Sequence, residues 1–276
     1  MTVVIIGAGI LGAALAQRLA RRGWRVTLVE QYVPGHARAA SGGRSRILRL
    51  AHGSDAPETR SVWLSRRLWR EIERETGTSL FSETGMAWFA PTGASEWERA
   101  SWKRLVDEGI AARQLSPAEA KTLFPDIRTD DLDHVLYEPL GGLLHAREAV
   151  VALARDAVSF GAELVTGRAA PEGEAVTVAT RRLRADQVVW ACGAWTPLLF
   201  PGLVHGRTIQ QDVFYFGVPP AWITPAVPAW GEWRERVTGT GDFRGHGFKV
   251  GADAAGPLLD PDSSRRQPVV EQETAV

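Results

Sequence analysis

The sequence predicts a mixed α/β fold, in which a parallel sheet covered by helices is interleaved with an antiparallel sheet. The first observation is a strand, a helix and a second strand within residues 2–30. The second is the return of this pattern at residues 147–191, after a stretch of long helices. The third is a group of short strands within residues 211–250, whose close spacing is typical of antiparallel pairing.

Residues 2–30 form the most regular unit. The strand at residues 2–6 is too apolar to have one face in water, and such strands belong to parallel sheets that are covered on both sides. The helix at about residues 10–22 has small side chains where it would press on the sheet, and Gly23 ends it. A second strand at residues 25–29 stops at Glu30. Because such crossovers are right-handed, we expect this strand to run parallel to the first.

The remaining elements follow in chain order. The middle region is predicted to contain a loop at residues 31–53, a helix at 57–76, a strand at 86–89, a helix at 95–108, a capped helix start at 116–119 and an acidic loop at 126–133. The second half is predicted to contain a helix at 147–160, strands at 163–166, 175–180, 182–184 and 187–191, the last of them buried, and strands at 211–218, 236–238 and 247–250. From residue 260 onward polar residues and proline dominate, which predicts a disordered tail.

Composition and charge exclude several classes of protein. Of the 276 residues 45% are hydrophobic, and 32 basic residues balance 32 acidic ones. This composition excludes intrinsic disorder of the whole chain, and the balanced charge argues against a nucleic-acid partner or an anionic membrane. The single cysteine, Cys192, allows neither an intrachain disulfide nor a cysteine-based zinc site. Without an apolar run of about 20 residues, we expect a soluble, cytoplasmic protein that holds no metal.

The strongest motif is a glycine-rich turn between the first strand and the first helix. Its members are Gly7, Ala8, Gly9, Ile10, Leu11 and Gly12. The first glycine allows a tight turn, the second allows close approach of a pyrophosphate, and the third allows the helix to pack on the sheet. Glu30, at the end of the next strand, can accept hydrogen bonds from an adenosine ribose. The alternative is an ordinary glycine-rich α/β turn, and the motif alone does not separate FAD from NAD.

A small, flexible and then basic block occupies residues 41–49. Arg46 and Arg49 would share one face if this stretch were helical. A guanidinium suits bidentate capture of a carboxylate and stacks well on flat rings. The alternative is a set of solvated arginines on a surface helix, because arginine is abundant throughout the chain.

With these motifs in place, the sequence resembles the FAD-dependent amine and amino-acid oxidases of the D-amino-acid oxidase superfamily, most closely the monomeric sarcosine oxidase branch. The similar stretches run in family order from residue 2 to about 261, and they are VVIIGAGILG, VTLVE, SGGRSRILRLAHG, TGMAWFAP, LYEPLGGLLHAREAV, ADQVVWACGAW and RGHGFKVGADAAGPLLDP. The resemblance implies a Rossmann-like FAD-binding domain at residues 1–80 and 143–205, interleaved with an antiparallel-sheet substrate domain at 81–142 and 206–260. Residues 261–276 would be a disordered tail.

The resemblance also implies roles for single residues. In the family pattern the glycine-rich turn and Glu30 bind the ADP part of FAD, and the remaining cofactor contacts are Ser41, Arg46, Ala169, Gly193 and Trp195. Arg49 would grip the substrate carboxylate. Lys249, one of three lysines, would lie over the flavin and promote its reaction with oxygen. The alternatives are a core tryptophan at Trp195 and a solvent-facing lysine at Lys249.

Three departures from the family pattern affect what is expected. Gly42 and Asp253 stand where family members have active-site histidines. Family members also continue beyond the position of Val276, through the cysteine that holds their flavin covalently and a second carboxylate-binding lysine. Cys192 lies in a different segment, so we expect the FAD to be bound non-covalently. The chain is thus expected to be a C-terminally truncated family member.

Three functions are therefore considered. The first is an FAD-dependent oxidase of secondary or N-methyl amino acids, in which hydride passes to the flavin and O2 reoxidises it to give H2O2. The second is a truncated or split family member without a complete active site, for which a partner subunit or segment would supply the missing part. The third is an NAD-dependent dehydrogenase, which only the shared glycine motif suggests.

Overall fold

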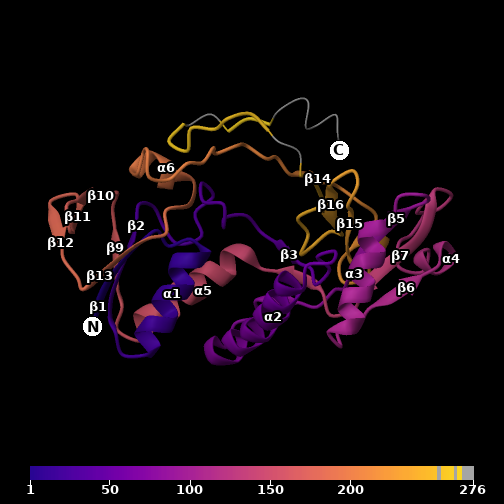
Figure 1. Ribbon diagram of the computed structural model, residues 1–276, viewed down its shortest axis with the longest axis horizontal. Coiled ribbons are helices and arrows are strands. Elements are labelled where there is room, and N and C mark those ends of the chain that lie inside the picture. The colour runs from indigo at the N-terminus through magenta and orange to yellow at the C-terminus, as the bar shows by residue number, and fades with distance from the viewer. Residues whose placement is uncertain (254–255, 264–265, 269–276) are drawn as a thin grey trace.

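The computed structural model describes residues 1–253, 256–263 and 266–268. Two halves lie side by side, one built on a parallel sheet and the other on a large mixed sheet (Figure 1). Helix α2 (Ala56–Thr76) runs along the base between them. Among the described residues, no helix has both the length and the apolar character needed to cross a bilayer. The interleaved α/β arrangement expected from the sequence is confirmed.

The parallel sheet collects strands from three separate parts of the chain. Its strands, in spatial order, are β13 (Gln187–Trp190), β1 (Thr2–Ile6), β2 (Arg25–Glu30) and β9 (Glu163–Thr166). Every neighbouring pair is parallel, as the right-handed crossover predicts. The expectation of a buried strand at residues 187–191 is wrong, because β13 lies at the edge of this sheet and its residues are exposed or half-buried.

Two different layers cover this sheet. Helices α1 (Ile10–Arg21) and α5 (Ala146–Ser159) pack on the face that presents Val3 and Ile5 of β1. A meander covers the other face, against Val4 and Ile6, and its strands are β10 (Ala169–Glu172), β11 (Ala175–Val178) and β12 (Arg181–Leu183). Both faces of β1 are therefore in the core, which accounts for its apolar sequence. Each such side chain contributes about 1.5–3 kcal/mol when fully buried.

The large sheet dominates the second half. Its spatial order is β14 (Phe214–Phe216), β17 (Phe248–Ala252), β16 (Val237–Thr240), β15 (Ala229–Glu232), β5 (Met86–Pro91), β7 (Leu132–Glu138) and β6 (Arg113–Leu115). All neighbours are antiparallel except β15 and β5, where Trp230 pairs with Ala87 in parallel register. The sequence did not predict β7 or β15. The start of β7 is polar and reads as loop, so its pairing with β5 comes from tertiary contacts rather than from local pattern.

A third, small antiparallel sheet corrects the expectation for the basic block. It consists of β3 (Arg46–Leu48), β8 (Gly142–Leu144) and β4 (Phe81–Ser82). The stretch around Arg46 is therefore a strand inside the predicted loop, and it is not helical. Because side chains alternate along a strand, Arg46 and Arg49 cannot share one face, and they serve different parts of the molecule.

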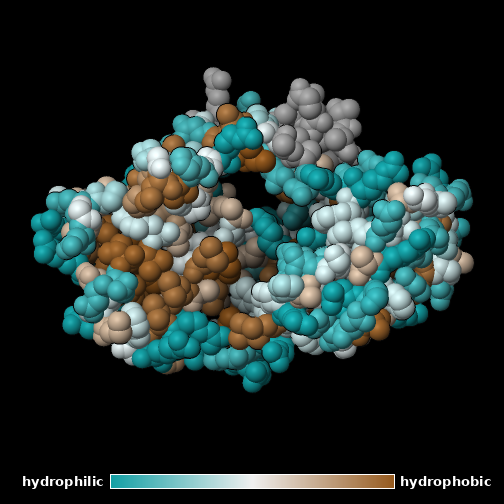
Figure 2. Space-filling model, in the orientation of Figure 1, coloured by the Kyte–Doolittle hydropathy of each residue, from teal (hydrophilic) through white to brown (hydrophobic). Residues whose placement is uncertain are grey.

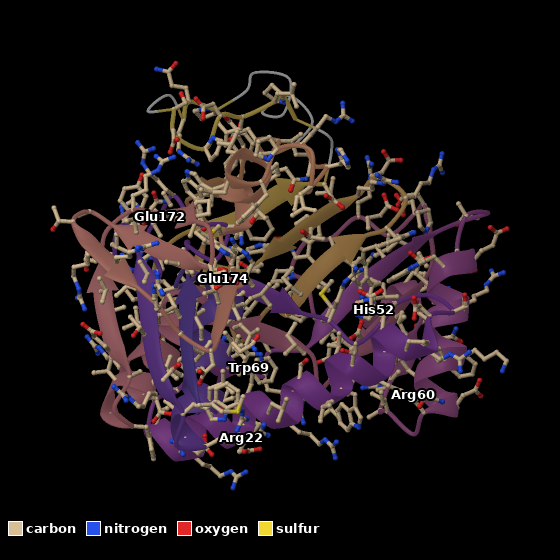
Figure 3. The ribbon with its side chains drawn as sticks, turned by 60° about the vertical axis from the view of Figure 1, so that its left-hand side comes forward. Arg22, His52, Arg60, Trp69, Glu172 and Glu174 are labelled. Carbon is tan, nitrogen blue, oxygen red and sulfur yellow. The ribbon has the colours of Figure 1, made fainter. Side chains whose placement is uncertain are left out.

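Helices α2 and α4 (Pro117–Ala120) begin where local capping signals predict. In α2 the Asp55 side chain accepts a hydrogen bond from the backbone of Glu58, and left-handed Gly77 ends the helix. The half with the large sheet also contains helices α3 (Glu96–Asp107) and α4. Three short helical turns follow later in the chain: η1 (Gly193–Trp195), α6 (Thr196–Leu199) and η2 (Pro220–Trp222). The capping box at the start of α4 is confirmed. Trp69 projects inward from α2 and packs against the cores of both halves, whereas Arg60 points outward (Figure 3).

Two extended segments cross between the halves at the top of the molecule. Residues 206–213 lead from α6 to β14, and residues 256–262 return alongside them (Figure 1). The segments pair at Ile209 and Leu258, and the Leu259 amide donates a hydrogen bond to the Thr208 carbonyl at 2.9 Å. An opening lies beneath this crossing in the space-filling view (Figure 2).

Candidate functional site

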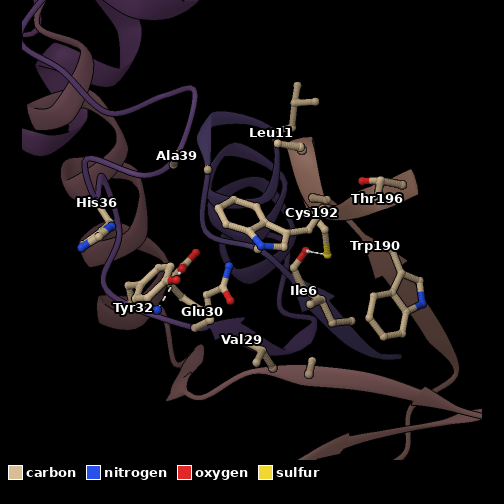
Figure 4. Close-up of a pocket in the computed structure, with 18 of the residues that line it drawn as sticks. Ile6, Leu11, Val29, Glu30, Tyr32, His36, Ala39, Trp190, Cys192 and Thr196 are labelled. Atoms are coloured by element: carbon tan, nitrogen blue, oxygen red, sulfur yellow. Dashed lines mark hydrogen bonds between the residues drawn. The ribbon is translucent and has the colours of Figure 1, made fainter. Parts of the chain in front are cut away.

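The ends of β1 and β2 open into a cavity of about 420 Å³, within the size range of small-molecule sites. Its wall comes from the glycine-rich turn, the loop after β2, the start of β10 and the turn after β13 (Figure 4). The predicted residues that line it are Gly7, Gly9, Ile10, Leu11, Glu30, Ser41, Ala169, Gly193 and Trp195. Ala8 and Gly12 belong to the turn behind this wall. Arg46, Arg49 and Lys249 lie outside the lining.

The three motif glycines are constrained by different neighbours. A Cβ on Gly7 would lie 2.4 Å from the Ala191 carbonyl oxygen, and Gly7 has a left-handed φ of +98°. A Cβ on Gly12 would lie 1.9 Å from the Gly7 carbonyl oxygen. A Cβ on Gly9 would meet nothing closer than the Ser41 Oγ, at 3.5 Å. The fold thus requires Gly7 and Gly12, whereas space over Gly9 fits a group that must approach the backbone, as the pyrophosphate of FAD does.

Glu30 and Ser41 hold the turn and the start of α1 in place. The Glu30 carboxylate accepts a hydrogen bond from the Ala8 amide at 2.8 Å. It also accepts one from the Tyr32 amide at 3.0 Å (Figure 4). Each carboxylate oxygen keeps a further lone pair, so Glu30 can also accept from a ribose hydroxyl. The Ser41 hydroxyl accepts from the Ile10 amide at 3.0 Å, which ties the long loop to the N-terminus of α1. Both residues thus fit a nucleotide at this helix end.

Aromatic and basic residues that the sequence did not single out complete the cavity. The rings of Tyr32 and His36 stack with centroids 4.4 Å apart, and both residues line the wall (Figure 4). Arg168 lies at the rim. Cys192 also faces the cavity, where burial raises its pKa to about 11 and its thiol donates to the Ile6 carbonyl. No spacing motif marks Tyr32, His36 or Arg168, because loop geometry alone brings them together.

Trp195 and Arg168 are held from outside by the segment that was expected to be disordered. The Asp262 carboxylate accepts from the Trp195 Nε1 at 2.8 Å and from both terminal nitrogens of Arg168 at 2.9 and 3.0 Å. This guanidinium keeps the pKa of Asp262 below its usual value. The tail prediction is therefore wrong for residues 261–263, which form an ordered turn, while residues 264–265 and 269–276 lie outside the described part. Trp195 is both buried and part of the cavity wall.

Replacing Asp262 by asparagine should loosen this turn from the cavity rim. Losing the charge removes one bidentate ion pair, which contributes about 1 kcal/mol at a partly exposed site. Hydrogen–deuterium exchange of the Leu259 amide should then become about fivefold faster. The same loosening is expected in the wild-type protein as the pH falls through the lowered pKa of Asp262, because protonation discharges the carboxylate. Glu163→Gln, which breaks an exposed pair with Arg181 elsewhere, is the control and should leave Leu259 unchanged.

Arg46 organises the loop that carries Ser41. Its guanidinium donates to the carbonyls of Ala40, Gly42 and Ser45. Ala40 belongs to the cavity wall, so Arg46 supports this wall although it does not line the cavity itself. The absence of a side chain at position 42, where the family pattern has a histidine, has a steric cause. A Cβ on Gly42 would lie 2.5 Å from the His36 carbonyl oxygen. Asp253, at the other departure, accepts from Gln211 at 2.9 Å.

Lys249 points from β17 into the interior and not into solvent. Its ammonium donates to the Ser45 carbonyl at 3.2 Å, which links the large sheet to the same loop. Burial, together with the nearby positive charge of Arg46, lowers the pKa of Lys249 to about 8. The lysine is thus a largely buried cation whose charge is lost slightly above neutral pH.

Arg49 lies between two indole rings in the second half. Its guanidinium carbon is 5.4 Å from the ring centres of both Trp88 and Trp233, within the range of cation–π attraction. Burial lowers the pKa of Arg49, and the carboxylate of Glu138 opposes that shift. Within residues 1–253, 256–263 and 266–268, no carboxylate lies within ion-pair distance of this guanidinium. Arg49 can therefore bind a carboxylate from outside the protein.

The comparisons with known proteins agree with this geometry. Residues 2–271 match the family described as FAD dependent oxidoreductase. The monomeric sarcosine oxidase of Bacillus sp. (strain B-0618) is 26% identical, with 96% of this chain and 71% of that protein aligned. The peroxisomal sarcosine oxidase of Homo sapiens is 32% identical, with 77% of this chain and 56% of that protein aligned.

Solved structures reproduce the whole described fold. The L-proline dehydrogenase of P. horikoshii superposes with a TM-score of 0.79 at 22% identity, covering 99% of this chain and 74% of that one. The iminodiacetate oxidase of Chelativorans sp. BNC1 superposes with a TM-score of 0.76 at 25% identity, covering 99% of this chain and 76% of that one. Flavin-dependent catalysis thus fits both the sequence match and the fold.

Proposed function

This chain belongs to the FAD dependent oxidoreductase family, and from that premise we propose that it oxidises secondary or N-methyl amino acids with O2 as the electron acceptor. The observation that carries the proposal is the Arg49 site, where a guanidinium without a carboxylate partner among the described residues lies between Trp88 and Trp233. An amino-acid carboxylate would supply the missing partner. The sarcosine oxidases among the relatives support this substrate class.

Three parts of the chain would divide the work. The glycine-rich turn and Glu30 would hold the nucleotide end of FAD in the cavity, with the pyrophosphate over Gly9 and at the N-terminus of α1. Arg49 would bind the substrate carboxylate and so orient the amine. Lys249 would stabilise the negative charge that develops on oxygen during its reduction, an effect that its buried setting strengthens.

Bound FAD supplies hydride acceptance from the carbon beside the amine nitrogen and passes the electrons to O2, giving an imine and H2O2. The protein contributes orientation and charge. Trp88, which is buried, shields one side of the guanidinium from water and so strengthens its attraction for a carboxylate, whereas Trp233 is 41% exposed.

The proposal is tested by purifying the protein with FAD and assaying a panel of amines for oxygen uptake and H2O2. Sarcosine and N-methyl amino acids should be oxidised, and the same amines without a carboxylate should be poor substrates. A yellow protein that oxidises none of the panel would favour the alternative of a family member with an incomplete active site. A colourless protein that binds NAD would overturn the FAD assignment.

We further expect the FAD to be released when the protein is unfolded. A cysteine must be a thiolate to add to a flavin, and the raised pKa of Cys192, about 11, keeps this thiol protonated near neutral pH. Acid precipitation should therefore leave the flavin absorbance in the supernatant. Flavin that stays with the pellet in wild type but not in Cys192→Ser would show a covalent link through this cysteine.

A further inference from the structure

A buried carboxylate lies directly behind Arg49. Glu138 ends β7, pairs in register with Met86 of β5 and is 0% exposed. Its Oε1 accepts from the Trp88 Nε1 at 2.8 Å, and its Oε2 accepts from the Leu50 amide. The Ala51 amide is a further donor. One carboxylate thus binds both the backbone that follows Arg49 and the Trp88 indole, which faces the guanidinium.

We infer that Glu138 is a positioning residue that fixes Arg49 for carboxylate binding, an inference that rests on the proposed role of Arg49 in the substrate site. The chain leaves Arg49 through Leu50 and Ala51, both 0% exposed, so their amides set the direction in which the arginine side chain emerges. Trp88 sets one wall of the guanidinium site. Glu138 holds both of these elements and does not itself touch the ligand.

The charge of Glu138 supports the same role. Its carboxylate attracts the Arg49 guanidinium and opposes the lowering of the arginine pKa by burial, more than Glu58 or Asp253 does. Burial raises the pKa of Glu138 to about 7, while its three donors and the Arg49 charge act in the opposite direction. No carboxylate–guanidinium ion pair forms between Glu138 and Arg49 in the described structure, so the guanidinium keeps its outer edge for a ligand.

Glu138→Gln is the central variant. A glutamine has nearly the same volume but carries no charge. Its side-chain NH2 would have to face the N–H group of either Leu50 or Trp88, so that two donors would meet without an acceptor. In the holoenzyme, the Kd of acetate, followed by its perturbation of the flavin spectrum, should rise about tenfold. The KM of a carboxylate substrate such as sarcosine should rise similarly with kcat nearly unchanged, whereas the KM of N-methylbenzylamine should not change.

Two further variants separate positioning from general stability. Glu138→Asp keeps the charge and should restore part of the acetate affinity. Trp88→Phe removes one of the three donors and replaces the indole beside Arg49 with a smaller ring, and it should give a loss in the same direction. Glu98→Gln is the matched control, because Glu98 is also buried and also has a pKa raised to about 7, and it makes no contribution to the charge environment of Arg49. It should leave the acetate Kd unchanged.

The outcomes distinguish this inference from the proposed function. If Arg49→Met weakens acetate binding but Glu138→Gln does not, the carboxylate site is correct and the role of Glu138 is overturned. If Arg49→Met has no effect on acetate binding, both the substrate site and this inference are overturned. Equal losses for sarcosine and N-methylbenzylamine in Glu138→Gln would show a merely structural role and would also overturn the inference.

Discussion

Lys249→Met is expected to slow the reaction of the reduced flavin with oxygen by a factor on the order of a hundred. The first electron transferred to oxygen creates an anion, and a buried ammonium nearby lowers the energy of that charge. Methionine keeps the apolar stem and removes only the cation. Stopped-flow mixing of the reduced enzyme with oxygen measures this step directly, whereas anaerobic reduction by an amine should change much less.

The pH dependence of the same step gives an independent check. Burial lowers the pKa of Lys249 to about 8, so its ammonium is present below this pH and is lost above it. The oxygen reaction of wild type should therefore slow as the pH rises through about 8, and this slowing should be missing from Lys249→Met. Lys103→Met, which removes an exposed lysine paired with Asp107, should behave as wild type. Equal oxygen rates in Lys249→Met and wild type would remove Lys249 from the flavin site.

Gly9→Val is expected to abolish FAD binding while leaving the chain folded. The nearest atom to a Cβ at this position is the Ser41 Oγ at 3.5 Å, and the backbone of Gly9 has an ordinary extended conformation. The added side chain therefore costs the fold little, but it occupies the space in which the pyrophosphate would lie. Flavin content after reconstitution and desalting measures the loss, and the circular dichroism spectrum of the apoprotein tests the fold.

Two other glycines separate binding from folding. Gly217 has open space around its Cβ position and lies outside the cavity, so Gly217→Val should retain flavin. Gly12→Val should destabilise the apoprotein itself, because a Cβ there would lie 1.9 Å from the Gly7 carbonyl oxygen. Wild-type flavin content in Gly9→Val would refute the position assigned to the pyrophosphate.

Much of the nucleotide-binding half could be predicted because local sequence determines it. The apolar strand, the glycine turn and the acid at Glu30 lie close together in the chain, and their roles follow from spacing alone. The surroundings of Arg49 could not be predicted in this way. The residues around it lie far apart in the sequence: Trp88 in β5, Glu138 at the end of β7 and Trp233 directly after β15. Nothing in their local sequence indicates that they belong to one site.

The misassigned elements have related physical causes. The basic block around Arg46 reads as loop or helix, and only pairing with β8 makes it a strand. The turn at Asp262 has a polar composition typical of disorder, yet its carboxylate meets donors from Arg168 and Trp195. Arg38 also donates to the Ser263 carbonyl. In both cases a partner remote in sequence determines the conformation.

The interleaving of the two halves has a consequence for how the chain folds during synthesis. Strand β1 is synthesised well before β13, one of its two neighbours in the sheet, which follows only at residues 187–190. At about 5–20 residues per second, β1 waits roughly ten seconds or more for this partner. Strand β5 must likewise wait for β15, where Met86 meets Ala229. Such remote pairings give a high contact order and slow folding. Although β2 and β7 can pair with them earlier, β1 and β5 each keep one apolar strand edge without its partner throughout that interval.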